Sequence, residues 1–220
     1  MEMKKEIATK ADKYLEHLNW RYATKRFDPE QKIPEHLMEA LLESVRLSAS
    51  SYGLQPYKVL VLTDPGLREK LRPLCWNQSQ ITDASAVLVF ANYADFDAQL
   101  IDSYLETVAE VRSVGPEKLK GYGDFMKSKL LELPTESKAE WTARQAYIAL
   151  GNLLSAAAAF RIDACPMEGF ERDKVNELLE LPSRGLNAAV IAAVGYRSEE
   201  DDTQHNHKVR RPENELFVHL

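Results

Sequence analysis

Two long apolar runs constrain the fold of this chain more than any other feature. They are AVLVFAN at residues 86–92 and NAAVIAAVGYR at residues 187–197. A strand that is apolar at nearly every residue is covered on both faces, because alternate side chains point to opposite sides of a sheet. Further strands are predicted at residues 57–64 and near residue 163, and long helical stretches separate them. We therefore expect one mixed α/β or α+β domain over residues 1–220.

Helical periodicity predicts the elements that cover these strands. The predicted helices lie at residues 5–19, 66–73, 96–112, 117–131, 137–160 and 171–181, with another that begins around Pro34. Ser137 and Glu140 match a capping box at the start of the longest helix. Its second half, ALGNLLSAAAAF, is apolar almost all round, which predicts a buried helix or a subunit interface. The final LFVHL predicts an edge strand.

Composition narrows the class of protein. The net charge of −6 argues against a general nucleic-acid binder, so any functional basic site must be local. Cys75 and Cys165 lack the spacing of a zinc site, and two cysteines in a chain of 220 residues are typical of reduced thiols in a cytoplasmic protein. The N-terminus lacks the apolar segment of a signal peptide. No apolar run approaches the roughly 20 residues of a membrane span.

Several common motifs are absent from the sequence. There is no GxGxxG after the first predicted strand, no GxxxxGK[ST] and no GxSxG. The histidines have no partner spacing for metal ligation, so we predict no metal site. The acidic run at residues 199–202 is typical of a solvated loop.

Three polar clusters near predicted loops remain as candidates for chemistry. They are Arg21, Thr24 and Lys25; Ser50, Ser51 and Gly53; and Lys208, Arg210 and Arg211. Hydroxyls, loop amides and guanidinium groups together suit a phosphate monoester, although each cluster alone is also typical of a solvated face. A fourth stretch, CPMEGF, places Glu168 between a proline and a glycine, where it is either exposed at a strand end or part of a plain turn.

Five stretches in this order resemble the nitroreductase family of FMN-dependent NAD(P)H oxidoreductases. They are RYATKRFD, SASSYGLQPY, NQSQITDASAVLVF, PMEGF and HKVRRP. The similarity is strongest to the oxygen-insensitive nitroreductase and dihydropteridine reductase subgroup. It implies an α+β fold with a mainly antiparallel sheet flanked by helices. It also implies an obligate-type homodimer that binds FMN at the interface and exchanges its C-terminal tail with the partner.

The resemblance implies two groups of FMN-binding residues within the chain's own basic segments. Residues implied at the phosphate and along the same segment are Arg21, Lys208, Arg210, Tyr22 and Ala23, with Ala23 standing where the family often has serine. Residues implied at the pyrimidine end of the flavin are Lys25, Asn77 and Gln80, with Gln80 in place of a second lysine. Arg26 has no family role, and we predict that it is solvated or paired with Asp28.

Other residues are implied around the flavin ring and the substrate. The loop of Ser50, Ser51 and Gly53 resembles the one that reaches the flavin from the partner subunit. The stretch along the flavin face and its N5 atom is Pro166, Met167, Glu168 and Gly169. Phe125 matches an aromatic residue over the nicotinamide and substrate pocket, and Arg112 is expected to meet the nicotinamide nucleotide.

The implied reaction is a ping-pong transfer of two electrons. NAD(P)H gives a hydride to FMN N5, and a nitroaromatic, a quinone or a similar small-molecule acceptor then takes its place. No side chain acts as a nucleophile, because the cofactor carries the chemistry. Three alternatives remain: a specialised flavin reductase such as a dihydropteridine reductase, a non-catalytic flavin-binding or regulatory protein, and a phosphometabolite site unrelated to flavin.

Overall fold

A computed structural model describes the backbone of residues 2–220 and the side chains from residue 9 onward. Its centre is a sheet in the order β1-β2-β4-β3, and every neighbouring pair of these strands is antiparallel. The strands are β1 (Tyr57–Leu62), β2 (Ala86–Tyr93), β3 (Asp163–Met167) and β4 (Leu186–Gly195). The two predicted apolar runs form β2 and β4, the inner strands of this sheet, and both are buried over nearly their whole length.

Helices cover the two faces of the sheet and extend beyond it. They are α1 (Glu2–Trp20), α2 (Glu35–Arg46), α3 (Pro65–Leu74), α4 (Gln80–Asp83), α5 (Ala98–Arg112), α6 (Lys120–Leu130), α7 (Thr135–Ala159), α8 (Arg172–Leu178) and α9 (Glu213–Leu216). Short 3₁₀ turns lie at Ser51–Gly53, Pro116–Lys118, Pro182–Arg184 and Asp202–His205. Strands and helices in one antiparallel assembly confirm the predicted α+β class.

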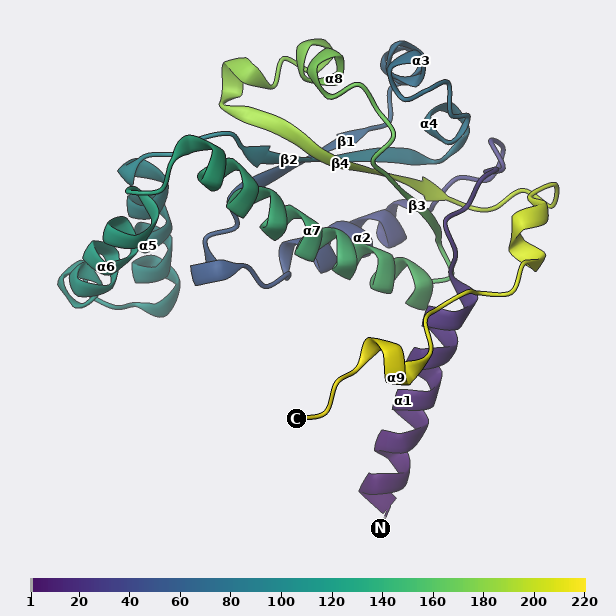
Figure 1. Ribbon diagram of the computed structural model, residues 1–220, viewed down its shortest axis with the longest axis horizontal. Helices are drawn as coiled ribbons and strands as arrows, with labels where there is room; N and C mark the ends of the chain where they lie inside the picture. The colour runs from purple at the N-terminus through teal and green to yellow at the C-terminus, as the bar shows by residue number, and fades with distance from the viewer. Residues whose placement is uncertain (1) are drawn as a thin grey trace.

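The sheet lies between two helical layers (Figure 1). Helix α7 contacts all four strands on one face, with α2 beside it, and α3, α4 and α8 lie on the other face. Leu41 of α2 and Leu153 of α7 are fully buried in the first layer, as are Leu71 and Val175 in the second. Helices α5 and α6 pack on each other at one end of the molecule around a small separate core.

A buried arginine of α3 contacts the short helix α4. The sequence did not predict this helix. Arg68 is 4% exposed. Its guanidinium donates hydrogen bonds to the carbonyl oxygens of Ile81, Thr82 and Ala84 at 2.7, 2.8 and 2.5 Å. These are carbonyl groups at the end of a helix, which lack partners within the helix itself. Arg68 thereby fixes the segment that presents Gln80.

Two predictions at element ends were wrong. The longest helix begins at Thr135 rather than Ser137, because Pro134 has the extended geometry of a helix-preceding residue and its carbonyl already accepts from Lys138 N at 2.9 Å. Ser137 is therefore inside the helix and cannot be the cap. The C-terminal LFVHL forms no strand: α9 ends at Leu216, and the residues after it are exposed.

Candidate functional site

The segment after α1 runs beside the edge strand β3. Ala23 forms a parallel bridge with Ala164, and Phe27 forms an antiparallel bridge with Arg197. The Thr24 hydroxyl, fully buried, donates to Asp163 at 3.3 Å. The segment Arg21–Phe27 therefore extends the sheet and carries its basic side chains along the edge of β3.

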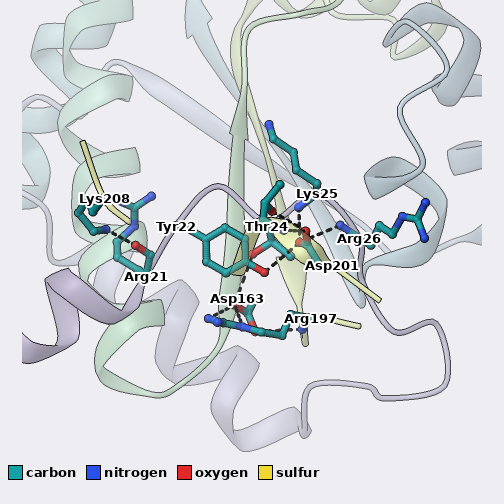
Figure 2. Close-up of polar contacts among 10 residues, drawn as sticks. Arg21, Tyr22, Thr24, Lys25, Arg26, Asp163, Arg197, Asp201 and Lys208 are labelled. Carbon is teal, nitrogen blue, oxygen red and sulfur yellow. Dashed lines mark hydrogen bonds and ion pairs between the residues drawn. The ribbon is translucent and has the colours of Figure 1, made fainter. Parts of the chain in front are cut away.

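The Asp201 carboxylate holds this segment in place (Figure 2). It accepts hydrogen bonds from the backbone N–H of Lys25 at 2.7 Å, from that of Arg26 at 3.1 Å and from the Tyr22 hydroxyl at 2.9 Å. It also accepts from the backbone and hydroxyl of Thr203. Asp201 is 2% exposed, so the prediction of a solvated acidic loop was wrong at this residue. Nothing in the run EEDD distinguished it from its neighbours.

The pKa of Asp201 reflects these contacts. Burial of the carboxyl acts to raise its pKa, but the hydrogen bonds from Thr203, Arg26, Lys25 and Tyr22 outweigh it and lower the pKa to about 2. Hydrogen bonds to the charged form of a carboxyl have this effect. The carboxylate is therefore ionised over the whole neutral range.

A second buried carboxylate supports the same segment from the sheet. Asp163 lies 2.6 Å from Nη2 of Arg197 and accepts from its Nε at 2.8 Å and its backbone N–H at 2.9 Å. The Arg197 guanidinium lies 4.3 Å from the ring centroid of Trp20 and 4.6 Å from that of Tyr22. Sequence reasoning missed this pair, although a charged residue opening a buried strand was a signal for Asp163.

Three cations gather at the start of the segment. Figure 2 shows Lys208 beside Arg21, and the Lys208 ammonium donates a hydrogen bond to the Arg21 carbonyl. Burial, followed by the charges of Arg21 and Arg210, lowers the pKa of Lys208. Burial and Arg210 likewise lower the pKa of Arg21. Among the described residues, none of these three cations has an ion-pair partner, so the cluster is arranged to accept an anion.

Lys25 and Gln80 both act on Cys165 of β3. Burial raises the pKa of the Cys165 thiol, whereas the charge of Lys25, a hydrogen bond from Gln80 and the charge of Arg21 act to lower it. The charges of Lys25 and Arg21 and the amide of Gln80 therefore act on Cys165, which precedes Pro166. Sequence analysis did not select Cys165 for the site.

Arg26 is solvated, as one of its two predicted alternatives states, but it is not paired with Asp28. It pairs with Glu200 at 3.2 Å, and both side chains are largely exposed. Asp28 instead accepts from Glu30 N and Gln31 Nε2 in its own turn. In Figure 2 Arg26 lies on the far side of the segment from Arg21.

The stretch from Pro166 to Gly169 packs against the loop that carries Asn77. A Cβ added at Gly169 would lie 2.7 Å from the Trp76 ring, so glycine permits this close approach. The Gly169 carbonyl accepts from Gln78 Nε2 at 3.0 Å. Trp76 and Asn77 both have φ of 55°, in the left-handed region. Met167 is buried, whereas Glu168 is exposed at the end of β3.

The remaining predicted residues lie in a second group near α5 and α6. The Tyr52 ring lies 6.4 Å from those of Phe125 and Tyr122, and the charge of Arg112 acts on the Tyr122 hydroxyl. Gly53, at φ 76°, is so close to Tyr104 that a Cβ would lie 2.6 Å from its hydroxyl. The loop of Ser50, Ser51 and Gly53 thus joins Phe125 and Arg112, not the cluster around Arg21.

Helix α7 separates the two groups within one chain. Gln145 accepts from Ser51 N at 2.8 Å, and Tyr147 donates to Glu168 at 2.5 Å. Residues two apart on an α-helix point about 200° apart, since each residue turns the helix by about 100°. Ser51 and Glu168 therefore lie on opposite flanks of α7, and a single chain does not bring the two groups together.

Metal-binding clusters and membrane-spanning helices are both absent from the described part of the chain. No group of three or more His, Cys, Asp or Glu side chains there could hold a metal ion. Among its helices, none has the length and apolar character needed to cross a membrane.

The role of Asp201 can be tested by its pH dependence. Its pKa is about 2 in the folded protein and about 3.9 in an unfolded chain, so the carboxylate stabilises the fold above about pH 4 and loses this effect as the pH falls towards 2. We expect Asp201→Asn to lower the free energy of unfolding by about 2 kcal/mol at pH 7, with the difference shrinking below about pH 4. Urea unfolding at several pH values measures it.

Asp202→Asn is the matched control for this experiment. It removes the same charge from the next residue, whose side chain is exposed, and should change the unfolding free energy by less than about 0.5 kcal/mol. An equal loss of stability in both variants, or a pH-independent loss in Asp201→Asn, would contradict the role of the Asp201 carboxylate in holding the segment.

Comparison with known proteins identifies the family. The model of the nitroreductase family matches residues 18–196. YfkO of Bacillus subtilis (strain 168), whose name places it among the NAD(P)H nitroreductases, is 38% identical over 197 residues, which are 83% of this chain and 88% of that protein. The structure is similar to that of the nitroreductase YdfN from B. subtilis, with a TM-score of 0.85 at 20% identity and coverage of 96% and 100% of the two chains.

A nitroreductase of Exiguobacterium sibiricum, solved in complex with FMN, gives a TM-score of 0.80 at 21% identity, over 94% of this chain and 97% of that one. At 20–21% identity the two solved structures establish the fold alone. The family match and the similarity to YfkO extend over most of the sequence and establish the family. The chain belongs to the nitroreductase family.

Proposed function

We propose that this chain is an FMN-dependent oxidoreductase that uses NAD(P)H to reduce nitroaromatics, quinones or similar small-molecule acceptors. The observation that carries the proposal is the cluster of Arg21, Lys208 and Arg210, which have no anionic partner among the described residues. Clustered cations repel one another and lower the stability of the fold unless an anion joins them. A phosphate dianion would satisfy all three with charge-assisted hydrogen bonds.

The residues present fit FMN at both ends of the cofactor. Arg21, Lys208 and Arg210 would hold its phosphate, with Tyr22 and Ala23 along the same segment. Ala23 supplies no hydroxyl, so the contact of the more usual serine is missing. Towards the flavin ring, the residues we assign are Lys25, Asn77, Gln80, Pro166, Met167, Glu168 and Gly169. The close approach of backbone at Gly169 supports this assignment.

FMN held by these residues would supply the redox chemistry, a two-electron transfer from NAD(P)H to the acceptor. The side chains of this protein would bind the cofactor and shift its reduction potential. The Lys25 ammonium lacks an ion-pair partner in the described structure, and a fixed cation stabilises negative charge that develops beside it. Gln80 is neutral, so this end of the site has one positive charge fewer than a site with two lysines.

We also propose a homodimer that completes the site. The loop of Ser50, Ser51 and Gly53, with Phe125 and Arg112, would come from one protomer and the Arg21 group from its partner, since α7 separates them in a single chain. Large exposed apolar side chains support a subunit interface: Tyr14, Leu15, Leu47, Ile148 and Phe160. The tail beyond Lys208 carries Val209, Leu216, Phe217 and Val218 exposed, which favours its exchange onto the partner.

Two predictions from the sequence stay predictions. They are the cytoplasmic localisation and the extent of a single FMN-binding domain over residues 1–220.

The function is tested by the visible spectrum of the purified protein, before and after NADH or NADPH is added. We expect a flavin spectrum that bleaches with one or both reductants and recovers with a quinone. An FMN-loaded protein without turnover on any acceptor would contradict the enzyme and favour a flavin-binding or regulatory protein. Turnover confined to a pterin would favour the specialised reductase. A colourless protein that cannot be reconstituted with FMN would favour the phosphometabolite site.

The phosphate role of Arg21 is tested by Arg21→Ala. A charge-assisted hydrogen bond contributes about 1.5–3 kcal/mol, so we expect FMN affinity to fall by roughly 10- to 100-fold in a fluorescence titration. Arg26→Ala is the control, because it removes a guanidinium from the same segment that is instead paired with Glu200. Equal FMN affinity in the wild type and Arg21→Ala would refute the role.

The dimer is tested at the exposed face of α7. Ile148 is 46% exposed, and Ile148→Glu would place a charge in the proposed interface, so we expect the sedimentation mass to fall to that of one chain and FMN to be lost. Val111→Glu changes a 77% exposed side chain on α5 and serves as the control. A wild-type protein that sediments as a monomer with bound FMN would contradict the proposal.

A further inference from the structure

One polar contact joins α7 to the end of β3 at the proposed site. The Tyr147 hydroxyl donates to Oε1 of Glu168 at 2.5 Å. Tyr147 lies on the outward stripe of α7 and is 40% exposed. The contact lies at the surface, outside the core and away from both ends of α7.

The backbone on both sides of Glu168 is fixed. Met167 pairs with Ile191 in the sheet. Gly169 lies against Trp76, and its carbonyl accepts from Gln78. The Glu168 side chain itself is exposed, and within the described structure Tyr147 supplies the one hydrogen bond that its carboxylate accepts. The position of this negative charge therefore depends on a single hydroxyl.

The Tyr147 hydroxyl stays protonated at neutral pH and can therefore always donate its hydrogen bond to Glu168. Burial, followed by the hydrogen bond to Glu168 and its charge, raises the pKa of Tyr147 to about 12, with Arg172 acting in the opposite direction. The phenol therefore keeps its proton throughout the neutral range. A tyrosine has few rotatable bonds, so holding it in one position costs little conformational entropy.

We infer that Tyr147 is a positioning residue that holds the Glu168 carboxylate against the flavin and thereby sets the reduction potential of the bound cofactor. The inference rests on the proposed function, which assigns Glu168 to the flavin. A fixed carboxylate beside the ring opposes the gain of negative charge on reduction, and its effect falls with distance. Lys25 acts in the opposite sense. Loss of the Tyr147 hydroxyl would release the Glu168 side chain into solvent and weaken its effect.

The test is the midpoint potential of FMN in the holoprotein. The proteins compared are the wild type, Tyr147→Phe, Glu168→Gln and the double variant. We expect Tyr147→Phe to favour the reduced flavin about tenfold, which is about 30 mV for a two-electron couple. In the Glu168→Gln background the same change should have no effect, because there is no charge left to position. Phenylalanine keeps the ring, so the fold and the affinity for oxidised FMN should be retained.

Ser183→Ala is the control. It removes an exposed hydroxyl that donates to the Glu180 carbonyl, outside both groups of proposed site residues, and should leave the potential unchanged. An unchanged potential in Tyr147→Phe, or an equal shift with and without the Glu168 charge, would overturn the inference while leaving the proposed function intact. A protein that binds no FMN would instead overturn the proposed function, and the inference with it.

Discussion

The arrangement of the candidate site depends on the hydrogen bonds to the Asp201 carboxylate. One buried anion satisfies two consecutive backbone N–H groups and the Tyr22 hydroxyl of a segment that has only isolated bridges to the sheet. These contacts are part-buried, and a hydrogen bond to a charged group contributes about 1.5–3 kcal/mol. Because the backbone of residues 22–26 is held this way, Arg21, Lys25 and Arg26 extend in different directions (Figure 2), and of the three only Arg26 has an ion-pair partner in the described chain.

Helix α7 forms much of the core and also separates the two groups of proposed site residues. Its inward residues cover all four strands, while its outward stripe carries Tyr147 and Ile148. The Ser50–Gly53 loop and the end of β3 meet its opposite flanks. An exposed apolar stripe on a core helix would remain in water in a monomer. The same helix thus accounts for the core, for the separation of the two residue groups and for the proposed interface.

The sequence predicted the inner strands and most helices well, because burial on both faces and helical periodicity are local patterns in the chain. It failed where a distant group decides the outcome. Arg68 donates to the carbonyl groups at the end of α4, 13 and 16 residues away. The start of α7 was missed for a local reason, because Pro134 begins the helix before Ser137 can cap it. Arg26 pairs with Glu200, 174 residues away, rather than with Asp28. Such contacts leave no trace in the spacing of neighbouring residues.

The sequence by itself determined the buried inner strands and the basic residues at Arg21, Lys25 and Lys208, and, through resemblance, the α+β class and the family. The resemblance already implied one site for Arg21 and Lys208, which are 187 residues apart; only the tertiary structure decided that no acidic side chain of the described chain pairs with them. It also decided that Asp201 is a buried clamp while its neighbours are not. The physical reason is that a charge is defined by what surrounds it after folding: the same carboxylate is solvated in a loop or ionised by converging donors in the interior.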